Sequence, residues 1–279
     1  MLISEAFDSY KANYMIIRNQ STRITETHEV CRRTLIQQLG DKDMADITVA
    51  DVGRWAKWLG RSRCQNTVRN YITRLRVVAD YVALMGLPSI NSALIPVPKR
   101  EASIPAFLTP KEITAMIDNA YNIRNAFVIS LLYSSGIRLS ELIQLNRGQI
   151  VDRCFTVIGK GKKARLCFID ERTEKLMAEY LKTRSDHNDA LVVSAQNKAR
   201  MTPTNVQLLI RNSAERAGID KRVTPHTLRH SFATNFLRNN GNMRYLSTML
   251  GHSSLNTTMI YTHVVDNDLQ EQYKKYHTI

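Results

Sequence analysis

Four of the chain's seven prolines fall in one stretch, Pro88 to Pro105, and this stretch divides the sequence. Proline fixes φ and has no backbone N–H, so neither a regular helix nor a central strand runs easily through such a segment. The residue before each proline is also pushed toward an extended conformation. We therefore expect two folded units, residues 1–87 and 106–279, joined by an extended linker over 88–105. A chain of 279 residues has the length of about two ordinary domains.

The first unit is predicted to be helical, because apolar residues recur in it at spacings of three and four. The stripe consists of Val68, Ile72, Leu75, Val78 and Val82. Arg69, Thr73 and Arg76 lie on another face of the same helix. This second face is exposed either to a DNA groove or only to solvent. The linker that contains Lys99 and Arg100 also has two interpretations. It is either an extended basic segment that lies along a polyanion or an ordinary solvated linker.

The second unit is predicted to be mostly helical with one β-hairpin. Thr109 and Glu112 form a capping box around Pro110, and an apolar helix over 123–135 ends at Gly136. A short helix follows from Arg138, and then the strand patterns CFTVIG and RLCFID flank a lysine-rich turn. Further helices are expected over 174–182, 204–217 and 225–239. The predicted fold class is mostly α with a small β-sheet, an α+β arrangement.

The charge of the chain indicates a polyanionic partner. Its formal net charge is +14, divided as +5 over residues 1–105 and +9 over 106–279. Nucleic acid is the favoured partner of such a basic chain. The sequence contains neither a secretion signal nor an apolar run long enough to span a membrane, so we expect a cytoplasmic protein.

The four cysteines are not expected to form a disulfide framework, because the chain is long and has no C-x-x-C pair. We expect all of them to be small buried residues. They are Cys31, Cys64, Cys154 and Cys167.

The C-terminal third holds an unusual group of functional side chains. It contains the run His226-Thr227-Leu228-Arg229-His230, then Leu250-Gly251-His252, then Tyr261. His226 and Arg229 lie one helical turn apart and so share a face. Gly251 is expected to end the helix before His252.

Five separated segments, in the same order, resemble the phage-integrase or tyrosine recombinase family, and most of all its Xer group. They are IPAFLTPKEI, SSGIRLSEL, VIGKGKKARL, TPHTLRHSFATNFL and LGHSSLNTTMIYTHV. The first half is more weakly similar, through TVRNYITRLRVVADYVALMG and the linker after it. The resemblance implies a helical core-binding domain that binds DNA over 1–87 and a mixed α/β catalytic domain over 106–279 that ends in a C-terminal helix.

The resemblance also implies a role for each member of a catalytic set. The set is Arg138, Lys160, His226, Arg229, His252 and Tyr261. The two arginines grip the scissile phosphate, the two histidines flank it, the lysine acts on the leaving group and the tyrosine is the nucleophile. Glu141 matches the acidic residue that supports this set in the family. Lys162, Lys163 and Arg165 are either phosphate contacts or parts of a solvated turn.

Elementary chemistry agrees with these roles. Fixed guanidinium groups stabilise the negative charge that develops on a phosphodiester under attack. A tyrosine hydroxyl with a pKa of about 10 needs a base at neutral pH, and a histidine with a pKa of about 6.5 is suited to that task. A 3′-phosphotyrosine link keeps the energy of the phosphodiester, so rejoining needs no ATP. We expect no cofactor and no metal.

These residues admit two other interpretations, a metal site and a different function. His226 and His230 have the i, i+4 spacing of a zinc pair, but the glutamate of the H-E-x-x-H pattern is missing. We therefore expect His230 and His263 to be structural or to support the catalytic residues from behind. The alternative functions are a type IB topoisomerase-like enzyme, which nicks and reseals one duplex, and a DNA-binding regulator without catalysis.

The expected partners are double-stranded DNA and further subunits. The roughly 100 residues before the catalytic part favour short inverted-repeat core sites. The segment after Tyr261 offers a small apolar face with Leu269, Tyr273 and Tyr276. This face is suited to docking on a neighbouring subunit, so we expect a homo- or hetero-tetramer on DNA.

Overall fold

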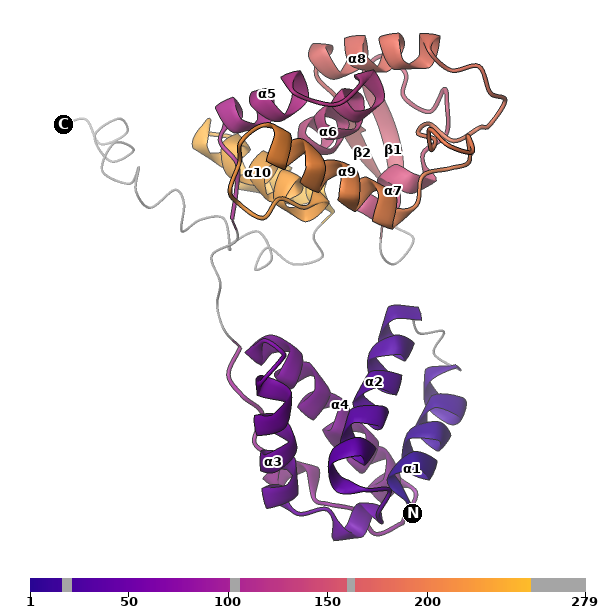
Figure 1. Ribbon diagram of the computed structural model, residues 1–279, viewed down its shortest axis with the longest axis vertical. Coiled ribbons are helices and arrows are strands. Elements are labelled where there is room, and N and C mark those ends of the chain that lie inside the picture. Colours follow the sequence, from indigo (N-terminus) through magenta and orange to yellow (C-terminus); the bar gives the residue numbers. More distant parts are fainter. Residues whose placement is uncertain (17–21, 101–105, 160–163, 252–279) are drawn as a thin grey trace, which may run out of the picture. The chain divides into compact units, whose positions relative to one another are not determined.

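Two units, Met1–Ser103 and Ile104–Ile279, make up the chain (Figure 1). The computed structural model describes residues 1–16, 22–100, 106–159 and 164–251. These residues are mostly helical and contain one two-stranded sheet, which confirms the predicted fold class. No helix in the described ranges is both long and apolar enough to cross a membrane.

The first unit is helical, as predicted. Its elements are α1 (Ile3–Tyr10), a π-helical turn (Lys11–Met15), α2 (Thr22–Leu39), a 3-10 turn (Met44–Asp46), α3 (Val49–Gly60) and α4 (Gln65–Leu84). The predicted apolar stripe lies on α4, and all five of its residues are buried in one core with Phe7, Leu35 and Trp55. Burial of this stripe fixes α4 against α1, α2 and α3.

Much of the proline-rich stretch packs against the first unit. Ile90 and Ile95 are buried in the core of that unit, on either side of a 3-10 turn over Ser92–Leu94. The side chain of Gln65 donates to the Lys99 carbonyl oxygen at 3.4 Å, and Arg69 donates to the Pro98 carbonyl oxygen. Helix α4 therefore contacts the stretch at the 3-10 turn and at the Pro98 and Lys99 carbonyls.

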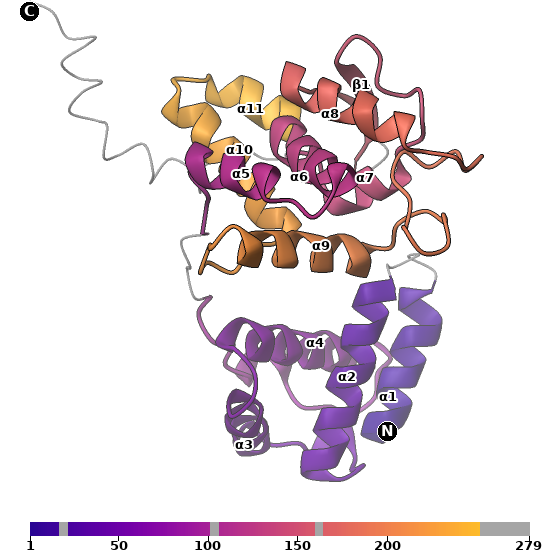
Figure 2. The ribbon, with the colours of Figure 1, turned by 45° about the horizontal axis from the view of Figure 1, so that its top comes forward.

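The second unit is built around one buried helix, α6. Its helices are α5 (Pro110–Asp118), α6 (Ile123–Ser135), α7 (Leu139–Gln144), α8 (Glu171–Lys182), α9 (Pro203–Arg216), α10 (Pro225–Arg238) and α11 (Met243–Leu250). Helix α6 lies among α5, α8, α9 and α10 and contacts all four (Figures 1 and 2). Most of its side chains are buried. This explains why its sequence is apolar on nearly all sides.

The predicted start of α5, end of α6 and start of α10 are confirmed. Thr109 and Glu112 form the capping box of α5, and Thr224 caps α10. Gly136 ends α6 with a left-handed φ of +61°. Helix α8 begins three residues before the predicted start, because the Asp170 side chain accepts from the Thr173 amide at 2.8 Å and caps the helix there.

The β-hairpin consists of β1 (Cys154–Ile158) and β2 (Ala164–Phe168), paired antiparallel so that Cys154 faces Phe168 and Ile158 faces Ala164. One face of the hairpin packs on the core and the other is exposed. The inward side chains are Phe155, Val157, Arg165 and Cys167. An arginine therefore occupies a position that its strand directs toward the interior.

All four cysteines are free, as expected, but the prediction that all four are buried is wrong. Cys31 and Cys167 are buried, whereas Cys64 is exposed and Cys154 is half-buried. Cys64 lies at the N-cap of α4, outside the packed face of that helix. Cys154 begins β1 on the side of the strand that points away from the core.

Candidate active site

Arg138 is placed by a sharp turn between two helices. Gly136 ends α6 in a left-handed conformation, and a Cβ built on it would lie 2.5 Å from the ring of Phe232, so only glycine fits. The chain then enters α7 with Arg138 at its N-cap. The Arg138 side chain is 36% exposed, so part of its guanidinium faces solvent where a phosphate can approach.

Glu141 fixes Arg138 from the next turn. Its carboxylate accepts from the Arg138 backbone N–H at 2.7 Å and from Nη1 of the same residue at 3.0 Å. The carboxylate is only 5% exposed. Burial by itself would raise the pKa of Glu141, but hydrogen bonds and charge from Arg165 and Arg138 outweigh it and lower the pKa to about 2. Glu141 is therefore ionised at neutral pH and anchors Arg138.

Arg229 connects two distant turns of the chain. It lies on α10 and is only 3% exposed. Its Nη1 donates to the Gly136 carbonyl oxygen at 2.6 Å, and its Nη2 donates to the Leu250 carbonyl oxygen at 2.7 Å. The turn that presents Arg138 and the end of α11 are thus tied to one guanidinium.

Three arginines converge on the last turn of α11. The carbonyl oxygens of three successive residues each accept from a different arginine. Met249 accepts from Arg165 Nε at 2.8 Å, Leu250 from Arg229 at 2.7 Å, and Gly251 from Arg138 Nη2 at 3.4 Å. Carbonyls at a helix C-terminus lack intrahelical partners and carry partial negative charge, so cations stabilise them. Gly251 then leaves the helix with a φ of +63°, as the sequence predicted, immediately before His252.

Arg165 is not part of a solvated turn, one of the two interpretations that the sequence left open, because its side chain is buried. Its side chain is 7% exposed and forms two hydrogen bonds with Glu141, at 2.7 and 2.6 Å. The sequence did contain a signal for this position. In a strand of period two, Arg165 shares a face with Cys167, which is buried.

His226 lies at the start of α10, one turn before Arg229. The residue is exposed, but the protein around the ring removes part of its hydration, which lowers the pKa of His226, and the positive charges of Arg229 and Arg138 lower that pKa further. Its ring meets that of His230 edge-on, with centroids 4.2 Å apart, and His230 is buried. A histidine held neutral at pH 7 beside two arginines can accept a proton there.

The structure therefore brings Arg138, Glu141, Arg229 and His226 together. Four predicted site residues, Lys160, Lys162, His252 and Tyr261, lie outside the described residues, as does His263. Of the cations predicted to contact DNA from the first unit, Lys99 and Arg100 are exposed and Arg76 is half-buried. Arg69 is half-buried against the Pro98 carbonyl.

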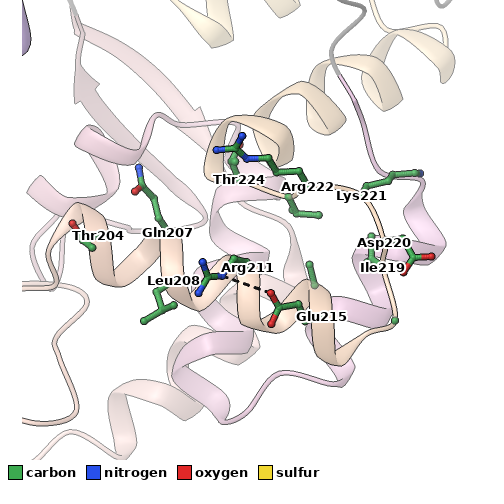
Figure 3. Close-up of a pocket in the computed structure, with 13 residues that line it drawn as sticks. Thr204, Gln207, Leu208, Arg211, Glu215, Ile219, Asp220, Lys221, Arg222 and Thr224 are labelled. Carbon is green, nitrogen blue, oxygen red and sulfur yellow. Dashed lines mark ion pairs between the residues drawn. The ribbon is translucent and has the colours of Figure 1, made fainter. Parts of the chain in front are cut away.

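A hollow of about 770 Å³ lies between α9 and the loop that leads to α10 (Figure 3). Gln207 and Arg211 extend from α9, and Lys221 and Arg222 come from the loop (Figure 3). The hollow ends at Thr224, which caps the helix that carries His226. Arg211 pairs with Glu215 at 3.6 Å, and Lys221 pairs with Glu112 at 2.7 Å. The sequence does not identify Gln207, Arg211, Lys221 or Arg222 as functional residues.

Within the described part of the chain, no three His, Cys, Asp or Glu side chains are grouped closely enough to hold a metal ion. The pair formed by His226 and His230 is a ring contact, and both side chains belong to one helix.

Comparison with known proteins gives consistent matches. A family model described as "Phage integrase family" matches residues 106–268. The chain is 32% identical over 228 residues to the tyrosine recombinase XerD of Oceanobacillus iheyensis, covering 76% of this chain and 75% of the relative. It is 31% identical to a tyrosine recombinase of Thermosipho africanus, covering 98% of this chain and 99% of the relative. The Tn1549 transposon integrase, solved in complex with transposon right end DNA, has a similar fold, with a TM-score of 0.82 over 99% of both chains at 18% identity.

Proposed function

Because this chain belongs to the phage integrase family, we propose that it is a site-specific DNA recombinase, an enzyme that cleaves and rejoins DNA strands. The observation that carries the proposal is the meeting of Arg138 and Arg229 at the end of α11. Both guanidinium groups contact the turn that leads directly into His252, and His226 lies one helical turn from Arg229. Two fixed cations beside a neutral histidine form a site suited to a phosphodiester under attack.

The proposed reaction uses side chains alone. Tyr261 loses its proton to a neighbouring base, for which His226 is suited, and its oxygen forms a bond to the scissile phosphorus. The bond from phosphorus to the 5′ oxygen breaks, and Lys160 supplies the proton that this oxygen takes up. Arg138 and Arg229 stabilise the charge on the non-bridging oxygens. The resulting 3′-phosphotyrosine is attacked by a 5′ hydroxyl in the reverse sequence, which rejoins the strands without ATP or metal.

The proposed substrate is double-stranded DNA with short inverted-repeat core sites, bound by four identical or related subunits in the cytoplasm. A net charge of +14 supports a polyanionic ligand. We propose that residues 1–87 contact DNA as a separate domain, through Arg69, Arg76 and the linker cations Lys99 and Arg100. Lys162 beside the proposed lysine acid, and the hollow lined by Arg211 and Arg222, add cations on the catalytic unit.

The experiment that tests this proposal begins with selection of a binding site from random duplexes carrying inverted repeats. The selected site is then built as a suicide substrate, in which a nick lets the cleaved strand diffuse away and traps the covalent complex. We expect an adduct that protease removes, formed equally well in excess EDTA. A DNA-binding regulator would bind the site and give no adduct.

A second assay separates recombination from topoisomerase-like activity. Two duplexes of different length, each carrying the selected site, are incubated with the protein, and recombinant lengths are measured. We expect recombinant products. Relaxation of a supercoiled plasmid with no recombinant product would instead indicate an enzyme that nicks and reseals one duplex.

A further inference from the structure

Arg165 is a buried cation that the implied catalytic set does not include. It comes from β2, and its partners come from two helices on either side, Glu141 on α7 and Met249 on α11. These three hydrogen bonds are 2.6 to 2.8 Å long, and each of the three guanidinium nitrogens donates one of them. The side chain thus joins three elements of the catalytic unit at one point.

We propose that Arg165 is a positioning residue for DNA cleavage. It holds Arg138, and the end of α11 that precedes His252, in the geometry that the reaction needs. It acts through Glu141 on one side and through the α11 carbonyls on the other, and it does not itself contact DNA. This role rests on the proposed recombinase function, because it presupposes a cleavage step.

The link to Arg138 runs through a shared carboxylate. Oε1 of Glu141 accepts from Nη1 of both Arg165 and Arg138, at 2.7 and 3.0 Å. Oε2 accepts from Arg165 Nη2 at 2.6 Å and from the Arg138 backbone N–H at 2.7 Å. Without Arg165, a buried carboxylate would lose two charged donors and bind the Arg138 guanidinium more tightly. That guanidinium would then be withdrawn from the phosphate.

The link to His252 runs through the backbone at the end of α11. Arg165 Nε holds the Met249 carbonyl, and a Cβ added at Gly251 would lie 2.9 Å from Arg165 Cδ. The arginine stem thus packs against the residue that precedes His252. A lysine has one terminal nitrogen and cannot hold both carboxylate oxygens and the Met249 carbonyl with the same geometry.

The chain contains a matched control in Arg184. Its side chain is 3% exposed, and it forms two contacts of 2.6 Å with the Asp186 carboxylate. It also donates to backbone carbonyls, those of residues 188, 190 and 191. None of these partners belongs to the implied catalytic set. Substitution of Arg184 therefore reports what the loss of a buried, forked arginine does to folding alone.

The test compares Arg165→Lys and Arg165→Gln with Arg184→Lys and Arg184→Gln. For each full-length variant we would measure the Tm, the Kd for the selected DNA site, and the single-turnover rate of adduct formation on a suicide substrate. The rate is measured with saturating protein, well below the lowest Tm. We expect both Arg165 variants to form the adduct at least about tenfold more slowly with a Kd within about threefold of wild type, since small displacements of catalytic groups cost that much or more. The Arg184 variants should lower the Tm and leave the rate within about twofold.

A double substitution tests the route of the effect. If Arg165 acts in part through Arg138, then adding Arg165→Gln to Arg138→Lys should slow the reaction less than Arg165→Gln does alone. Three outcomes would overturn the positioning role. The effects of Arg165→Gln and Arg138→Lys on the rate could be fully additive, the rate of Arg165→Gln could lie within twofold of wild type, or Arg184→Gln could slow the reaction equally. These outcomes leave the recombinase function intact, because wild type still forms the adduct. Absence of an adduct with wild type would overturn both.

Discussion

The guanidinium of Arg229 donates to the carbonyl oxygen of Leu250 across 2.7 Å, although the two residues belong to different helices. The same guanidinium holds Gly136, two residues before Arg138. One proposed catalytic arginine is therefore also a structural connection between the turn that presents Arg138 and the turn that precedes His252. Loss of Arg229 should affect both chemistry and stability, whereas loss of the more exposed Arg138 should affect mainly chemistry.

Replacement of either arginine separates these two effects. Arg138→Ala and Arg229→Ala should each slow adduct formation by roughly 10²- to 10³-fold, the usual loss for one donor to a developing oxyanion. Only Arg229→Ala should also lower the free energy of unfolding substantially, by about 1–3 kcal/mol, because it leaves two buried carbonyls without that donor. Urea titrations and single-turnover cleavage measure the two quantities. Cleavage within tenfold of wild type would exclude a phosphate-gripping role.

Replacement of the proposed nucleophile should abolish cleavage and spare binding. Tyr261→Phe removes only the hydroxyl, so affinity for the selected site should change by less than about threefold, because phosphate contacts dominate binding. No adduct should form on a suicide substrate. A protease-sensitive adduct in this variant would assign the nucleophile to another residue.

The pH dependence of cleavage should report His226. Desolvation and the charges of Arg229 and Arg138 lower the pKa of His226 below the ordinary histidine value of about 6.5. In the free enzyme the ring is therefore still neutral at pH 6.5. If His226 is the base, the acidic limb of kcat/KM lies below pH 6.5, since that profile reports the free enzyme. Bound phosphate adds negative charge and should move the limb to higher pH in the saturated complex. A limb that is unchanged in His226→Gln would show that another group titrates.

The stability of the catalytic unit should fall in acid through Glu141. Its folded pKa of about 2 lies below the ordinary value, so its contribution is complete above about pH 4.5 and is lost as pH falls toward 2. The loss should be on the order of a few kcal/mol, because the carboxylate is buried and doubly paired. Urea unfolding of wild type and Glu141→Gln at several pH values isolates the contribution of Glu141 to the free energy of unfolding. If that free energy falls equally with pH in the two proteins, Glu141 does not cause the loss.

Subunit assembly should depend on the segment after Val265. A net charge of +14 opposes association in free solution, and the small apolar face that the sequence predicts for Leu269, Tyr273 and Tyr276 would give only a weak contact. Such a contact suffices once DNA raises the effective concentration of partners. Deletion of residues 266–279 should therefore spare half-site binding and abolish cooperative filling of the second half-site in gel-shift titrations. Equal cooperativity would place the contacts elsewhere, and a stable tetramer without DNA would contradict the charge argument.

Local features of this chain were predictable from sequence because their causes lie within a few residues. The capping box of Thr109 and Glu112 joins residues three apart, and Gly136 ends α6 through its own φ preference. The β1–β2 hairpin likewise pairs strands separated by a short turn. The same locality placed Arg138 at a helix start and His226 one turn from Arg229.

Tertiary structure alone decided what each of these arginines contacts. Arg165 reaches Glu141 across 24 positions and Met249 across 84, and Arg229 reaches Gly136 across 93. In sequence, Arg165 looks like the end of a lysine-rich turn, and only its period-two relation to Cys167 indicates that it faces the interior. The burial is possible because folding brings a carboxylate from α7 and the open carbonyls of α11 to the inner face of β2, where together they offset the cost of removing a guanidinium from water.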